Sequence, residues 1–106
     1  MKLLKNIKLP KGFEEGEGYR VDVDEKPELI YEAYVFTTEL SFEAAISALD
    51  SLLSKHYGPF KKTDGGISCV LTCSLPTQEI TAQITNFGEY CGGYINSKIQ
   101  WSWGYK

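Results

Sequence analysis

Residues 41–57 read Ser-Phe-Glu-Ala-Ala-Ile-Ser-Ala-Leu-Asp-Ser-Leu-Leu-Ser-Lys-His-Tyr, and this stretch decides the fold. Its apolar residues recur at steps of three and four, which places them on one stripe of an α-helix. Ser41 is a good N-cap, and Gly58 followed by Pro59 ends the helix. The stripe comprises Phe42, Ala45, Ile46, Leu49, Leu52, Leu53 and Tyr57. We therefore predict a helix from Ser41 to Tyr57 whose apolar face packs against another element.

Three segments after the helix alternate apolar and polar residues with a period of two, covering residues 67–75, 80–87 and 94–105. This alternation is typical of antiparallel strands with one buried and one wet face. We expect Ile67 to be buried with Cys69 and Leu71, because the three residues share one parity. Trp101 and Trp103 share the parity of Ile95 and Ile99, so we expect both tryptophans to fill the core.

Two shorter patterns precede the helix. Residues 19–23 alternate as a strand does, and residues 29–38 carry apolar side chains on both faces, which indicates a central or doubly covered strand. Residues 1–18 are expected to form a loosely held N-terminal arm. The sequence thus predicts a single α+β domain in which one helix packs on a mainly antiparallel sheet of four or five strands, in the order β-β-α-β-β-β.

The composition is that of a folded domain. The chain has 106 residues, 42% of them hydrophobic and 24% charged, which is ordinary for a globular protein. No apolar run approaches the ~20 residues that span a bilayer. Three cysteines make an odd count, and we expect all of them to be reduced. We expect a cytoplasmic protein, although a removed upstream signal segment remains open.

The charge is distributed unevenly along the chain. Eleven of the fourteen acidic residues lie between Glu14 and Asp50, where only Arg20 and Lys26 offset them. Such a block attracts cationic partners and speeds their association. The leading hypothesis is a non-enzymatic, inhibitor- or immunity-like module that binds a basic protein. Its candidate residues are Glu14, Glu15, Glu17, Asp22, Asp24, Glu25 and Glu28.

Three alternatives are weighed against this hypothesis. The first is a small-molecule binding module with an aromatic pocket between helix and sheet, lined by Tyr31, Tyr34, Tyr94, Trp101 and Trp103. The second is an enzyme that uses Cys91 as a nucleophile and His56 as its base. The third is self-association through the polar sheet face, since the oligomeric state is left open by the sequence.

Other chemistries find no support in the sequence. Cys69 and Cys73 lie about 13 Å apart if they share one strand, too far to join His56 around a zinc ion. Residues 22–27 lack the glycine and the final glutamate of a calcium loop. The acidic pI of about 5.1 argues against a nucleic-acid groove. We therefore expect no cofactor, no metal, no nucleic acid and no membrane partner.

Overall fold

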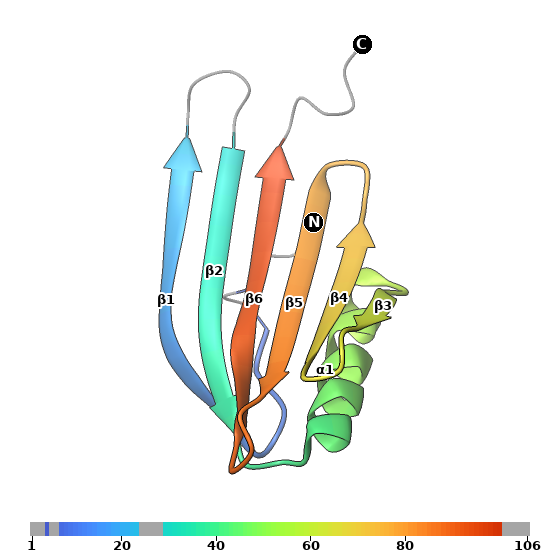
Figure 1. The fold of residues 1–106 in the computed structure, drawn as a ribbon. Coiled ribbons are helices and arrows are strands. Elements are labelled where there is room, and N and C mark those ends of the chain that lie inside the picture. Colours follow the sequence, from blue (N-terminus) through green and yellow to red (C-terminus); the bar gives the residue numbers. More distant parts are fainter. Residues whose placement is uncertain (1–3, 5–6, 24–28, 101–106) are drawn as a thin grey trace.

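A computed structural model describes residue 4, residues 7–23 and residues 29–100 of the chain. Within these residues the fold is α+β, with one helix and a six-stranded antiparallel sheet in the chain order β-β-α-β-β-β-β (Figure 1). The predicted fold class is therefore confirmed, with one strand more than the sequence indicated. Trp101 and Trp103 lie outside the described residues, so their expected place in the core stays a prediction.

The sheet places the last strand in its centre. The spatial order is β1-β2-β6-β5-β4-β3, and every neighbouring pair is antiparallel. The elements are β1 (Phe13–Val23), β2 (Leu29–Thr38), α1 (Phe42–Tyr57), β3 (Lys61–Asp64), β4 (Ser68–Ser74), β5 (Gln78–Asn86) and β6 (Cys91–Gln100). The strand at 29–38 is thus central, as its two apolar faces predicted, because β2 pairs on both sides.

The helix forms where its sequence predicted. The Ser41 hydroxyl accepts a hydrogen bond from the Ala44 amide at 3.3 Å, which satisfies one of the free N–H groups of the first turn. At the other end, the Gly58 amide donates to the Ser54 carbonyl at 2.9 Å. Gly58 has a φ of 110°, a conformation that glycine adopts without strain, and the helix ends there.

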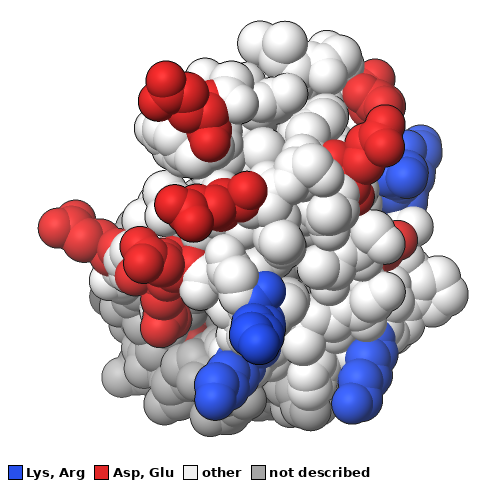
Figure 2. All heavy atoms as spheres, turned by 90° about the horizontal axis from the view of Figure 1, so that it is seen from below, with Lys and Arg blue, Asp and Glu red and all other residues white. Residues whose placement is uncertain are grey.

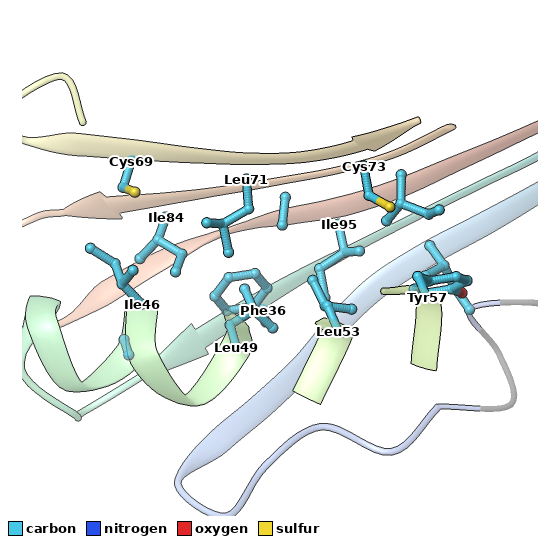
Figure 3. Close-up of a cluster of buried hydrophobic side chains, with 14 of the residues drawn as sticks. Phe36, Ile46, Leu49, Leu53, Tyr57, Cys69, Leu71, Cys73, Ile84 and Ile95 are labelled. Atoms are coloured by element: carbon cyan, nitrogen blue, oxygen red, sulfur yellow. The ribbon is translucent and has the colours of Figure 1, made fainter. Parts of the chain in front are cut away.

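The helix covers β4 and β5 on one face of the sheet, which we call the inner face (Figure 1). Leu49 and Leu53 of α1 point toward Leu71 of β4 and Ile95 of β6 (Figure 3). The three cysteines are buried and unpaired, so the prediction that they are reduced agrees with this structure. The alternation predicted for β4 and β5 is confirmed, since every second residue of both strands is buried.

The N-terminal segment covers the part of the inner face over β2 that the helix does not reach. Leu4 is buried, while Ile7 and Leu9 pack against the same core. The Leu4 amide donates a hydrogen bond to Oε1 of Glu32 at 2.9 Å. Residues 13–18 belong to β1 rather than to the predicted arm, because β1 begins at Phe13 and pairs with β2 from that residue on.

Two further details differ from the predictions. Strand β3, with the sequence Lys-Lys-Thr-Asp, was not predicted, because it is exposed at every position and has no apolar alternation. Ile67 was predicted to be buried but is 70% exposed. It has the parity of Cys69, but it lies in the turn before β4 begins at Ser68 and is not among the residues that pack on the core.

Candidate protein-binding surface

One end of the sheet gathers several chain segments that are far apart in sequence. Here β1 begins, β2 ends, α1 begins, and the β3–β4 and β5–β6 turns meet (Figure 1). The two turns are joined directly, since the Asn86 amide donates a hydrogen bond to the Ile67 carbonyl at 2.7 Å. We call this region the turn end.

Apolar side chains are exposed at the turn end. Within the described residues, the exposed large hydrophobic side chains are Val35, Ile67, Phe87 and Tyr90, and the last three all lie in the two joined turns. Phe87 is 58% exposed and Tyr90 is 46% exposed. Phe87 and Tyr90 are in contact with each other, and an exposed apolar group of this kind is typical of contact surfaces.

The β5–β6 turn holds its two aromatic rings in a fixed arrangement. The rings of Phe87 and Tyr90 stack with centroids 5.2 Å apart and planes inclined by 30°. The Phe87 amide donates to the Tyr90 carbonyl at 3.0 Å, and Oδ1 of Asn86 accepts from the Gly88 amide at 2.9 Å. A Cβ atom at Gly92 would lie 3.5 Å from the Phe87 ring, so this ring rests over a residue that has no side chain. The stacked pair is therefore ordered before any partner arrives.

A depression of about 650 Å³ opens beside this aromatic pair. Its lining residues are Gly12, Phe13, Glu14, Thr37, Thr38, Glu39 and Tyr90. The Thr38 hydroxyl links the two segments that line the depression, because it donates to the Gly12 carbonyl at 2.7 Å and accepts from the Leu40 amide at 3.1 Å. Phe13 is supported from below by Phe36, with ring centroids 5.3 Å apart.

Two carboxylates line the depression, two more lie in segments at the same end of the sheet, and the exposed Lys11 adjoins the lining residue Gly12. Glu14 and Glu39 line the depression, Glu43 lies in the first turn of α1, and Glu89 lies between the two stacked aromatics in sequence; all four are exposed. Figure 2 looks onto this end and shows separate groups of acidic side chains on it, with basic side chains on other parts of the same face. The turn end thus combines an exposed apolar centre with an anionic rim.

The acidic residues predicted to bind a partner differ in where the structure places them. Glu14, Glu15 and Glu17 are exposed on β1, and Asp22 is part of the same strand. Asp24, Glu25 and Glu28 lie outside the described residues. Glu32, which belongs to the same acidic block, is fully buried on the inner face and adds nothing to the surface.

Three of the five predicted ligand-binding aromatics come together. Tyr31, Tyr34 and Tyr94 line one depression of about 560 Å³, together with Glu17 and Asn96 among others. Tyr31 and Tyr94 belong to the face opposite the helix, which we call the open face, and the Tyr94 hydroxyl donates to Oε1 of Gln83 at 2.9 Å. The prediction that this pocket lies between helix and sheet is wrong, because core side chains fill that space (Figure 3).

The structure does not bring Cys91 and His56 together. Cys91 pairs with Thr38 at the turn end, whereas His56 lies in the last turn of α1, some 20 Å further along the helix from its start near Thr38. Burial raises the pKa of the Cys91 thiol, which disfavours the nucleophilic thiolate. The described residues hold no group of three or more metal-ligating side chains.

Comparisons with protein-family models, with characterised proteins and with solved structures find no match to this chain. In the part of the chain that the structure describes, no helix is both long and apolar enough to cross a membrane.

Sequence reasoning missed the apolar half of the turn end. Ile67 was assigned to a buried strand face, and Phe87 and Tyr90 were assigned no role. A signal was present: two aromatics stand among turn-forming residues in Asn-Phe-Gly-Glu-Tyr (residues 86–90), where the chain leaves the sheet and an aromatic ring has no core to enter.

Proposed function

We propose that this chain is a non-enzymatic protein-binding module that binds a basic protein through the turn end. The observation that carries the proposal is the exposed stacked pair of Phe87 and Tyr90 beside a depression lined by Glu14 and Glu39. Protein interfaces commonly combine an aromatic centre with a polar rim, and tyrosine is enriched among the residues that contribute most to binding.

The chemistry of the turn end selects a cationic partner. A lysine or arginine side chain in the depression would meet the Tyr90 ring and the carboxylates of Glu14 and Glu39 at once. Rings attract cations through their π face, and carboxylates form charge-assisted hydrogen bonds with them. The anionic rim would also steer a basic protein toward this end during diffusion.

Affinity capture from native lysate tests the proposal. The wild-type chain and a Glu79→Gln control, altered at an exposed carboxylate at the other end of the sheet, are expected to retain the same basic protein at low salt. The Glu14→Gln/Glu39→Gln and Tyr90→Ala variants are expected to lose it, and high salt should release it from wild type. Recovery of no basic protein, or equal retention by all four chains, would overturn the proposal.

A second candidate function is small-molecule binding on the open face, which the depression beside Tyr31 and Tyr94 favours. An open, tyrosine-lined hollow suits a planar aromatic ligand. Thermal-shift screening with planar aromatic compounds tests it: a ligand should raise the melting temperature of wild type and have a smaller effect on Tyr94→Ala. Failure of every compound to shift wild type would remove this candidate.

A further inference from the structure

The two edges of the sheet differ sharply. Strand β3 is only four residues long and carries Lys61 and Lys62, both of which are features that keep an edge from pairing with other chains. Strand β1 has eleven residues and neither lysine nor proline, and no other strand of the described residues lies on its outer side (Figure 1). Strand β1 therefore presents a row of backbone groups without a sheet partner.

The outer edge of β1 has one long regular part. The register with β2 shifts between Glu15 and Gly18, so a bulge divides the strand. From Gly18 to Val23, six consecutive residues pair with β2 without interruption. In an edge strand, alternate residues point their N–H and C=O groups away from the sheet, so this part can accept an additional strand.

Carboxylates lie immediately before that regular part. Glu14, Glu15 and Glu17 are exposed, and Glu14 also lines the depression at the turn end. A second copy of β1 carries four acidic residues and one arginine, so its net negative charge disfavours self-pairing. An extended segment with lysine or arginine residues is complementary in charge.

We propose that an extended basic segment of the partner adds to β1 as a seventh, antiparallel strand. This inference rests on the proposed function, since it takes the same basic protein as the occupant. The turn end would hold the body of the partner while β1 receives the segment, because Phe13 and Glu14 belong to both surfaces. Antiparallel pairing is the arrangement of every strand pair already present.

The direction of pairing fixes the order of residues in the segment. An antiparallel strand that starts opposite Val23 ends near Glu17, Glu15 and Glu14. Its first residues meet the regular part, where the charges of Arg20 and Asp22 offset each other, and suit β-branched side chains; its last residues meet Glu17, Glu15 and Glu14 and suit lysine or arginine. The expected segment is therefore apolar or β-branched first and basic last.

Two synthetic peptides of identical composition test this order: Val-Thr-Val-Thr-Lys-Lys-Lys and Lys-Lys-Lys-Val-Thr-Val-Thr. The first is expected to bind the full chain about tenfold more tightly, because in the antiparallel register its lysines reach Glu17 and the neighbouring Glu15, whereas those of the second reach Asp22, whose charge the nearby Arg20 offsets. Amide exchange should slow at alternate residues of 18–23, a pattern that loose electrostatic attraction does not produce.

Two controls separate this inference from its alternatives. The Glu15→Lys/Glu17→Lys variant should remove the preference between the peptides, whereas Tyr90→Ala, which alters only the turn end, should keep it. Equal affinities, or unchanged exchange across 18–23, would overturn the inference while capture at the turn end could still succeed. Slowed exchange in the free chain that grows with its concentration would also overturn it, because a second copy would then be the occupant.

Discussion

At the scale of single residues, Glu32 belongs to an acidic block that the sequence places on the surface, but its side chain is buried. It stands in the acidic block, yet its parity on β2 matches that of Phe36, so the strand turns it to the inner face. A buried carboxylate is unfavourable unless it is hydrogen-bonded, and here it accepts from the Leu4 amide, with the Tyr34 hydroxyl 3.5 Å from Oε2. Glu32 thereby fixes the N-terminal segment to the sheet.

Replacing this carboxylate is expected to destabilise the fold. Glu32→Leu leaves the Leu4 amide without its acceptor in a buried place, which costs about 1–3 kcal/mol in the free energy of unfolding. Urea denaturation measures this loss. Glu79→Leu, at an exposed position on β5, is the matched control and should change stability by about 0.5 kcal/mol or less. Equal stability of the Glu32→Leu and control chains would contradict the role given to Glu32.

Tyr57 makes stability sensitive to alkaline pH. Burial, and then the nearby Glu32 carboxylate, raise the pKa of Tyr57 well above its ordinary value of 10.0, against an opposing hydrogen bond with Gln78. Because the unfolded state loses this proton first, the stabilisation is complete below about pH 10 and declines as pH rises further. Urea unfolding between pH 8 and 11 should show this decline, and Tyr57→Phe should flatten it above pH 10. The same dependence of the unfolding free energy on pH in Tyr57→Phe and wild type would contradict this role of Tyr57. The pKa values of the buried thiols are also raised by burial, but the thiols contribute equally to both chains.

At the scale of elements, those with a regular apolar period could be predicted from the sequence. The stripe from Phe42 to Tyr57 and the alternation around Leu71 and Ile84 need only local spacing, and the structure contains both. Strand β3 could not be predicted, because Lys61–Asp64 joins the sheet through backbone pairing alone and buries no side chain. The exposure of Ile67 could not be predicted either, because it depends on where the neighbouring strand ends.

The helix face gives an element-scale prediction. Leu49 is fully buried against the sheet, whereas Leu52 is only partly covered. Leu49→Ala should therefore cost about 2–5 kcal/mol in unfolding free energy, and Leu52→Ala, the matched control, distinctly less. Chemical denaturation of both chains measures the difference. A larger loss for Leu52→Ala would mean that the helix turns a different face to the strands.

At the scale of the whole molecule, the acidic surface was only partly visible in the sequence. The block from Glu14 to Asp50 indicated an anionic region, but folding buries Glu32 and places Glu89, in the β5–β6 turn, at the same end of the sheet as Glu14, Glu39 and Glu43. The two aromatic residues of the surface lie in one turn, whereas the approach of the turn that holds Ile67 is a long-range contact that no local pattern encodes.

Once a partner is captured, the acidic rim of the turn end should govern its association rate, and the aromatic pair should govern its dissociation rate. Neutralising the rim in Glu14→Gln/Glu39→Gln should slow association, by about tenfold at low salt, and weaken its salt dependence, since long-range attraction governs encounter. Tyr90→Ala should mainly speed dissociation, because it removes a packed contact. Surface plasmon resonance at several salt concentrations separates the two. Identical association rates for wild type and the rim variant would contradict electrostatic steering.

The most direct test of the central claim is site-specific photo-crosslinking of the full chain in native lysate. A photoreactive residue at Phe87 places the probe in the aromatic turn, and one at Ser74 places it at an exposed position at the opposite end of the sheet. The account predicts a covalent adduct with a basic protein from position 87 that disappears at high salt, and none from position 74. Adducts of equal yield from both positions, or none from position 87, would contradict the turn end as the binding surface.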